Sequence, residues 1–239
     1  MTKPIIGITV SAMKNPRTDE EHGRYFLDRA YIDRIVAAGG VPVLIPPGSD
    51  AQTLATILDG WLIPGGGDFD ASLWGEETHP EAGLEYYGRT ETELHLYKSA
   101  PPNLPIFGIC YGCQLVNIAQ GGTIIQHLPD LLGNDSHRGD PIQDYTIEPG
   151  SRLGKIVGSS ARGKSWHHQA VGKLGQDLKA VAWHEDGTIE GIEGTGDRWF
   201  LGVQWHPERT DVPESAVLFD AFIKAARAFK ESKAGVATV

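Results

Sequence analysis

The sequence has 239 residues, of which 40% are hydrophobic, and a formal net charge of −10. This length allows one large domain or two small ones, and a chain with this charge and no basic run is not expected to bind nucleic acid. Its two cysteines, Cys110 and Cys113, lie too close in sequence to cross-link distant segments. No segment has the pattern of a signal peptide or the roughly 20 apolar residues of a membrane span. These features predict a cytoplasmic protein without membrane contact.

In the first half of the chain, short apolar runs alternate with helical patterns. The predicted strands cover residues 5–10, 41–46, 60–63 and 105–109. The predicted helices cover residues 25–38, 51–58, 91–99 and 114–120. The polar stretch 69–88 predicts an irregular loop. Buried strands that alternate with helices indicate a doubly wound parallel sheet.

The second half of the chain has a different pattern, typical of antiparallel or edge strands. The predicted strands cover residues 145–148, 178–183, 189–193 and 200–205. An amphipathic helix is predicted over 213–230, and a frayed tail over 231–239. Because no linker or internal repeat is present, we expect a single domain over residues 1–230. Its predicted fold is α/β and flavodoxin-like, with a mostly parallel sheet and antiparallel edge strands.

Cys110 lies in a glycine-rich segment, 108–114, between a predicted buried strand and a helix. A residue at such a turn lies at the carboxyl edge of the sheet, where open α/β folds place their sites, and the glycines allow the tight backbone of a nucleophile elbow. The helix N-terminus favours a thiolate, and the Tyr111 N–H can face a developing oxyanion. Three alternatives remain at this point: a buried structural cysteine, a thioredoxin-like pair with Cys113, and half of a zinc site that lacks its second pair of ligands.

Two further polar segments follow predicted strands. His206 and Glu208 come after the strand over 200–205, and the glycines Gly65-Gly66-Gly67 come after the strand over 60–63. A base and an orienting carboxylate are what an activated cysteine needs, and exposed glycine amides can bind an oxyanion. Taken separately, these segments are also typical of a surface histidine and an ordinary turn. Together they predict one site, because all of them fall at the same edge of one sheet.

At these residues the chain resembles the class I glutamine amidotransferase superfamily. That superfamily has a Gly-x-Cys-x-Gly-x-Gln elbow, a late His-Pro-Glu and a glycine-rich oxyanion segment. Within it, the chain looks most similar to the γ-glutamyl-γ-aminobutyrate hydrolase-like branch. Further matching stretches span most of the chain, at 4–9, 38–42, 62–68, 74–77, 117–123, 165–171 and 186–193.

The resemblance implies a cysteine hydrolase that cleaves the γ-glutamyl amide of a small amine through a thioester, without a metal or organic cofactor. It implies a catalytic triad of Cys110, His206 and Glu208, and an oxyanion hole made by the Tyr111 amide and that of Gly66 or Gly67. The residues that it implies for substrate contact are Gln114, His167, His168, Gln169 and Glu93.

Some positions depart from the pattern of the branch. Tyr111 stands where Arg is usual, Thr90 where Asp is usual after Arg89, and Lys164 where Asn is usual. Cys113 is also unusual beside the nucleophile. Since the predicted triad is intact, these departures concern the identity of the substrate rather than the type of reaction.

Three other functions compete with the hydrolase. The first is a glutaminase subunit that delivers ammonia to a separate synthase; the second is a thiol–disulfide protein that uses Cys110 and Cys113; the third is a non-catalytic binding module. The released amine is left open between γ-aminobutyrate, a polyamine and other amines. No metal is expected at His167 and His168, because adjacent residues point apart and no acidic or Cys ligand stands at ligand spacing. A homodimer is the base-rate expectation for the oligomeric state.

Overall fold

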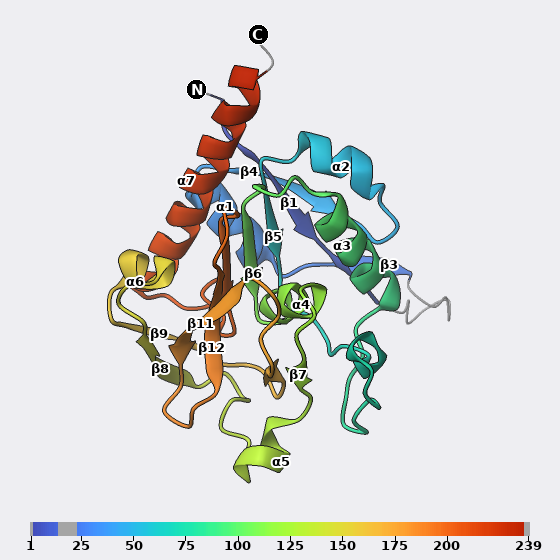
Figure 1. Ribbon diagram of the computed structural model, residues 1–239, viewed down its shortest axis with the longest axis vertical. Coiled ribbons are helices and arrows are strands. Elements are labelled where there is room, and N and C mark those ends of the chain that lie inside the picture. The colour runs from blue at the N-terminus through green and yellow to red at the C-terminus, as the bar shows by residue number, and fades with distance from the viewer. Residues whose placement is uncertain (1, 14–22, 237–239) are drawn as a thin grey trace.

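The computed structural model describes residues 2–13 and 23–236, without the side chains of 235 and 236. Its centre is a nine-stranded sheet with helices on both faces (Figure 1). Five neighbouring strands are parallel: β4 (Val41–Ile45), β1 (Ile5–Thr9), β5 (Gly60–Ile63), β6 (Ile106–Ile109) and β13 (Phe200–Val203). Four antiparallel strands continue the sheet: β12 (Ile189–Gly194), β11 (Leu178–Trp183), β8 (Ile142–Ile147) and β9 (Ser160–Lys164).

Two hydrophobic cores lie on the two faces of this sheet. One core packs α1 (Arg29–Ala37), α6 (Arg152–Val157) and α7 (Pro213–Val236) against side chains such as Ile8 and Phe107. The other packs α2 (Ala51–Ile57), α3 (Tyr87–Ser99) and α4 (Tyr111–Ala119) against side chains such as Ile63 and Ile106. Burial on both faces explains why β1, β5 and β6 are nearly continuous apolar runs, whereas the edge strand β4 is apolar although most of its residues are exposed.

Besides α6 and β9, which the sequence analysis does not predict, several short elements lie outside the predicted pattern. They are β2 (Ser11–Met13), β3 (Arg24–Phe26), the 3₁₀ turn η1 (Ala71–Trp74), β7 (Ile124–Ile125), α5 (Leu128–Leu132) and β10 (Ala170–Val171). β2 pairs with β3, and β7 pairs with β10, in two small ribbons beside the main sheet. The helix predicted over 25–38 therefore starts too early: Tyr25 and Phe26 are in β3, and α1 begins after Asp28, whose side chain accepts a hydrogen bond from the Ala30 N–H.

The last helix is longer than predicted: α7 continues to Val236, through residues 231–236, where the sequence predicts a frayed tail. Lys233 Nζ donates to the Leu58 carbonyl at 2.9 Å and lies 2.8 Å from an Asp59 carboxylate oxygen. Lys230 Nζ lies 3.2 Å from the same carboxylate. These contacts tie the last turns of the helix to the start of β5. Residues 237–239 lie outside the described part of the chain.

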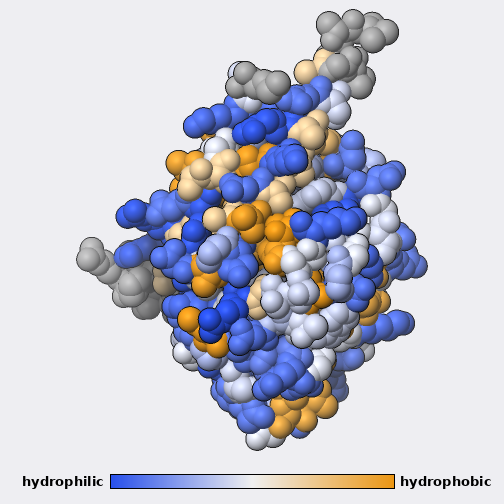
Figure 2. All heavy atoms as spheres, turned by 90° about the vertical axis from the view of Figure 1, so that its left-hand side faces the viewer, coloured by the Kyte–Doolittle hydropathy of each residue, from blue (hydrophilic) through white to orange (hydrophobic). Residues whose placement is uncertain are grey.

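The face of the molecule that carries α6 and α7 is largely hydrophilic, with small apolar patches between charged side chains (Figure 2). Within residues 2–13 and 23–236, no helix combines the length and the apolar character that crossing a membrane requires. The long helix α7 alternates buried apolar residues with exposed charged ones, as a helix that packs on one side does.

The α4 helix lies unusually close to the sheet at its first turn. A Cβ atom on Gly112 would overlap the Ile63 carbonyl oxygen, and one on Gly108 would lie 2.5 Å from the Gly112 carbonyl oxygen. Glycines at both positions therefore let the start of α4 sit directly on β5 and β6. This contact fixes where the residue between β6 and α4 is held.

Candidate active site

Cys110 forms the turn between β6 and α4, as the sequence predicts. Its backbone has φ 52° and ψ −107°, a conformation that residues other than glycine rarely adopt. The Cys110 N–H donates to the Val203 carbonyl at 2.7 Å, so the turn is anchored to the end of β13. Strain of this kind is typical of functional turns, and here it presents the thiol at the carboxyl edge of the sheet.

His206 and Glu208 lie in the loop that follows β13. His206 Nδ1 is 2.6 Å from Glu208 Oε1, and both side chains are buried. The loop is braced by the His206 N–H, which donates to the Lys164 carbonyl at 2.8 Å. A Cβ atom on Gly65 would lie 3.0 Å from His206 Cε1 and 3.8 Å from Cys110 Cβ. The imidazole and the thiol therefore converge over Gly65.

The surroundings of His206 favour its charged form. Burial of the ring lowers the pKa, but the Glu208 carboxylate and the Cys110 sulfur outweigh burial and raise the pKa of His206 to about 10. An imidazolium is thus expected at neutral pH, next to the sulfur. A nucleophile, a proton carrier and an orienting carboxylate are the parts that covalent acyl transfer requires.

Two glutamines, Gln204 and Gln114, form a chain of hydrogen bonds that reaches the Cys110 sulfur. Gln204 Nε2 lies 3.4 Å from Cys110 Sγ and can donate to it. Gln114 Nε2 donates to Gln204 Oε1 at 3.0 Å and to the Gln169 carbonyl at 3.1 Å. Sequence reasoning missed Gln204; the signal was an amide within the apolar run that leads to His206. Gln114, predicted to contact substrate, uses its amide group within the protein.

The structure distinguishes between the glycines predicted for the oxyanion hole. The Gly67 N–H donates to Glu85 Oε2 at 3.0 Å, and the Gly65 N–H donates to the Tyr31 hydroxyl at 3.0 Å. Gly67 is therefore not available as an oxyanion donor. Across the part of the chain that is described, the N–H groups of Gly66 and Tyr111 have no hydrogen-bond partner. These two amides remain as donors for a developing oxyanion.

Glu93, which the sequence predicts to contact substrate, is not among the residues that line the two cavities beside Cys110, and its carboxylate is used within the protein. Its carboxylate is fully buried and accepts from Thr9 Oγ1 at 2.5 Å, Arg89 Nε at 3.0 Å and the Tyr111 hydroxyl at 2.8 Å. The cause is the orientation of α3, which turns Arg89 and Glu93 inward as an i,i+4 pair. Arg89 in turn donates to the Gly65 carbonyl at 3.1 Å and so supports the glycine loop.

Two departures from the branch pattern contact one another. The Tyr111 hydroxyl lies 2.9 Å from Thr90 Oγ1, its ring stacks on Phe69 with centroids 4.3 Å apart, and the Arg89 guanidinium lies 4.2 Å from the ring centroid. Burial and the Glu93 carboxylate raise the pKa of Tyr111 well above its usual value, so the hydroxyl keeps its proton and donates to Glu93. The side chain of Tyr111 therefore supports α3, and its backbone N–H, at the first position of α4, follows directly after Cys110.

Replacing Tyr111 with phenylalanine should destabilise the fold by about 2 kcal/mol, because the buried Glu93 carboxylate loses a hydrogen-bond donor. Urea denaturation followed by circular dichroism measures this change. The matched control is Tyr87→Phe, since the Tyr87 side chain is 66% exposed and should change stability by less than about 0.5 kcal/mol. Equal midpoints for the two variants would show that the Tyr111 hydroxyl contributes nothing.

Cys113 is a free thiol that faces away from Cys110. It is buried against β13, where a Cβ atom on Gly202 would lie 2.9 Å from its Sγ. Burial, the Cys110 sulfur and the Glu190 carboxylate all raise the pKa of Cys113 well above its usual value. A buried, protonated thiol is a poor partner for thiol–disulfide exchange, which argues against the redox alternative.

Two cavities border Cys110 and share Gly66, Gly67 and Trp166. The larger, of about 460 Å³, extends past β2, β3 and the glycine loop and is lined by apolar side chains and by a few charged ones, including Asp28, Glu85 and Arg209. The smaller, of about 160 Å³, is lined mainly by polar residues, namely Asp68, Gln114, Arg138, His167, His168 and Gln169.

The adjacent histidines predicted to contact substrate both border the smaller cavity; His168 uses both ring nitrogens within the protein, whereas His167 uses only Nδ1 in a hydrogen bond. His168 Nε2 lies 2.8 Å from Asp68 Oδ2, and its Nδ1 lies 3.0 Å from His127 Nδ1. His167 Nδ1 lies 2.9 Å from the Gln169 carbonyl oxygen, and its Nε2 lies 3.4 Å from Glu190 Oε1.

The sequence of this chain matches a known protein family. A sequence model of the family described as peptidase C26 matches residues 4–208. A Mycobacterium tuberculosis protein named "Putative glutamine amidotransferase Rv2859c" is 37% identical over 242 residues, which cover 95% of this chain and 76% of that protein. The γ-glutamyl-γ-aminobutyrate hydrolase PuuD of Escherichia coli K12 is 29% identical over 249 residues, covering 94% of each chain. Among solved structures, a "putative gmp synthase subunit a protein" from Thermoplasma acidophilum is similar in fold, with a TM-score of 0.71 at 16% identity over 98% of each chain. This likeness confirms the predicted α/β fold.

Proposed function

The chain belongs to the peptidase C26 family, and from that premise we propose that it hydrolyses γ-glutamyl amides with Cys110 as nucleophile, His206 as base and Glu208 as the group that orients His206. The observation that carries the proposal is the strained Cys110 turn, which meets the buried His206–Glu208 pair over Gly65. Membership of this family of glutamine amidotransferase-like proteins confirms the predicted resemblance; the bond cleaved and the roles of the three residues are our proposal.

In the proposed mechanism, His206 holds the proton of Cys110 and the thiolate attacks the γ-carbonyl carbon. The carbonyl oxygen becomes an oxyanion, to which the N–H groups of Gly66 and Tyr111 donate. His206 then gives its proton to the leaving amine, and a thioester forms on Cys110. Water, deprotonated by His206, attacks the thioester and releases glutamate.

The two cavities support an assignment of the two ends of the substrate. The smaller cavity has the size and polarity for a glutamyl group, with the Arg138 side chain at its wall as a partner for a carboxylate. The larger cavity opens on the other side of Cys110 and has far more room than ammonia needs. Its mixture of apolar and charged side chains suits a leaving amine with a carbon chain and a charged end.

The second candidate function is a glutaminase that delivers ammonia to a separate synthase. The relative from Mycobacterium tuberculosis, at 37% identity, carries an amidotransferase name and favours this candidate. The two functions share the acyl-enzyme chemistry and differ only in the leaving group. The larger cavity favours the amide hydrolase, because a site for ammonia alone would not need it.

The test is a panel of substrates assayed for glutamate release: glutamine, γ-glutamyl-γ-aminobutyrate and a mono-γ-glutamylated polyamine. We expect kcat/KM to be higher for at least one of the two bulkier amides than for glutamine by about tenfold or more, the scale that a few filled contacts provide. Cys110→Ala, checked for folding by circular dichroism, is the blank for contaminating enzymes.

Glutamine as the best substrate would favour the ammonia-delivering function instead. No glutamate from any member of the panel, with a folded wild-type chain, would overturn the hydrolase of γ-glutamyl amides altogether.

A further inference from the structure

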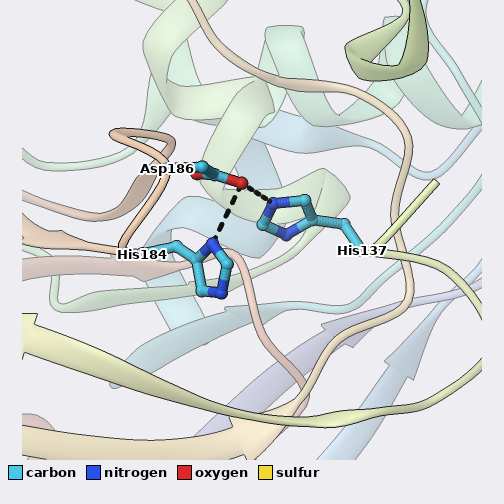
Figure 3. A group of neighbouring side chains, drawn as sticks. All are labelled: His137, His184 and Asp186. Carbon is cyan, nitrogen blue, oxygen red and sulfur yellow. Dashed lines mark hydrogen bonds and ion pairs between the residues drawn. The ribbon is translucent and has the colours of Figure 1, made fainter. Parts of the chain in front are cut away.

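A second group of titratable side chains lies buried beyond the wall of the smaller cavity. It consists of His137, which follows α5, His167, which lies between β9 and β10, and Glu190 on β12. Asp186 and His184, from the turn between β11 and β12, extend the group on the side of His137 (Figure 3). The Glu190 side chain is 0% exposed, and those of the two histidines are 2% exposed. The proposed mechanism uses none of these ring nitrogens or carboxylate oxygens.

The polar atoms at the centre of this group lie close together but do not pair. Glu190 Oε1 is 3.3 Å from His137 Nδ1 and 3.4 Å from His167 Nε2. Across the described residues, neither nitrogen and neither oxygen of Glu190 has a hydrogen-bond partner of ordinary geometry. Burying a carboxylate without hydrogen bonds is costly, so a positive charge is required among these atoms.

The ring nitrogens that point away from Glu190, His137 Nε2 and His167 Nδ1, are called the outer nitrogens, and their partners determine where the protons of the two rings lie. His137 Nε2 is 2.8 Å from Asp186 Oδ2, and His167 Nδ1 is 2.9 Å from the Gln169 carbonyl oxygen. Both oxygens are acceptors: the carbonyl has no proton, and the Asp186 carboxylate also accepts from the Thr188 N–H at 2.9 Å and lies 3.0 Å from His184 Nδ1. The outer nitrogens therefore donate. In the neutral imidazoles, the inner nitrogens then carry lone pairs that face the Glu190 oxygen.

This arrangement has the features expected of a metal site. Histidine ligands ordinarily donate their second N–H to a carboxylate or a backbone carbonyl, as His137 and His167 do. In a tetrahedral zinc site, bonds of about 2.0–2.1 Å to nitrogen and oxygen set neighbouring ligand atoms about 3.3–3.4 Å apart. The distances from Glu190 Oε1 to the two nitrogens, 3.3 and 3.4 Å, agree with that spacing.

We propose that His137 Nδ1, His167 Nε2 and Glu190 bind a divalent transition-metal ion of the zinc type, with Asp186 and the Gln169 carbonyl orienting the two histidines. The expectation of no metal rested on the lack of an acidic ligand near His167 in the sequence. The fold supplies that ligand from 23 residues further on, and a second histidine from 30 residues before. Under this proposal His167 is a metal ligand rather than a substrate contact.

The site would hold one wall of the active site in place. His167 directly follows Trp166, whose carbonyl oxygen lies 4.0 Å from Cys110 Sγ. Gln169, two residues further, accepts the hydrogen bond of Gln114. A bound ion would therefore connect Glu190 on β12 and His137 after α5 to the segment around Trp166 and His167, which lines both cavities. Its role would be to position that segment.

The experiment uses the full chain without an affinity tag and with the Cys110→Ala substitution, so that zinc cannot bind the active-site thiol. Metal content is measured by mass spectrometry of the purified protein. Metal stripped with dipicolinate is then replaced by Zn²⁺, followed by calorimetry, or by Co²⁺, followed by visible absorption. We expect about one ion per chain, a rise in melting temperature on adding Zn²⁺, and the intense visible bands of tetrahedral Co²⁺.

Two variants test the ligand assignment. Glu190→Gln keeps the volume of the side chain and should abolish binding of about one equivalent of Zn²⁺, whereas Glu193→Gln, on the same strand, should retain it. Asp186→Asn, at a partly exposed side chain, should weaken binding about tenfold, the usual effect of losing an orienting carboxylate.

The proposal fails if the stripped protein binds no Zn²⁺ and its melting temperature does not respond to the metal. It also fails if Glu190→Gln and Glu193→Gln bind Zn²⁺ equally well. In the first case a proton would supply the charge, and nitrogen NMR would show His137 as an imidazolium. That state is the rival because two carboxylates flank His137, with Asp186 Oδ2 2.8 Å from Nε2 and Glu190 Oε1 3.3 Å from Nδ1.

Discussion

Replacing Cys110 with alanine should reduce glutamate release from the best γ-glutamyl amide by at least about 10³-fold, while the chain remains folded. Without the sulfur no thioester forms, and the loss of a nucleophile cannot be compensated by its base, because members of such a triad act as a unit. The substitution keeps the Cβ atom and the strained turn, whose N–H donates to Val203. Steady-state kinetics over the substrate panel, with a melting curve for each protein, measures the effect.

The matched control is the same substitution three residues further on. Cys113→Ala removes a buried, protonated thiol that faces Gly202, and should leave kcat/KM within about tenfold of wild type, since the variant loses packing and no reacting group. An equally large loss of activity in both variants, with both chains folded, would contradict a single nucleophile and would favour a function that needs both cysteines.

Replacing Gly112 with alanine should destabilise the chain by about 4 kcal/mol or more, among the largest effects of a single methyl group. A Cβ atom there would overlap the Ile63 carbonyl oxygen, and the Ile63 backbone cannot move aside because β5 is paired on both sides by β1 and β6. In an open helix the same change would be favourable by roughly 1 kcal/mol, so the expected sign itself tests the close contact.

Chemical denaturation monitored by tryptophan fluorescence measures this loss, and the control is Gly150→Ala. A Cβ atom on Gly150 meets nothing within 4 Å, and its φ is outside the left-handed region, so the change should be within about 0.5 kcal/mol. If the Gly112 variant is as stable as the Gly150 variant, then α4 does not lie as close to β5 as described here, and the position of Cys110 needs another explanation.

The middle of the central sheet was predictable from sequence because its inner strands, such as β5, β6 and β13, are buried on both faces. Runs such as Ile5–Thr9 and Phe200–Val203 must be apolar throughout, and that pattern is visible without a structure. The ribbons were not predictable, since β7 and β10 have two residues each and their pairing joins positions far apart in the chain. Tyr25 and Phe26 were assigned to a helix because their apolar character fits either element, and only the pairing of β3 with Ser11–Met13 decides between them.

The site was predictable where it depends on the sheet edge alone. Cys110, His206 and the glycine loop each follow a strand, so their convergence follows from parallel strand order. Side-chain orientation was not predictable: the sequence cannot show that Glu93 faces Tyr111 or that the Gly67 N–H is used by Glu85. The group of His137, His167 and Glu190 was not predictable for a related reason, since its members come from three segments that only the fold brings together.

The position of β13 has a consequence for how the protein is made. This strand lies in the middle of the sheet, between β6 and β12, although residues 200–203 are synthesised long after β6. During translation the strands up to β6 can assemble on one side, but the two halves of the sheet cannot join until β13 leaves the ribosome and fills the gap. His206 and Glu208 arrive immediately behind it. Under the proposed mechanism, Cys110 therefore lacks its base until β13 has taken its place between β6 and β12.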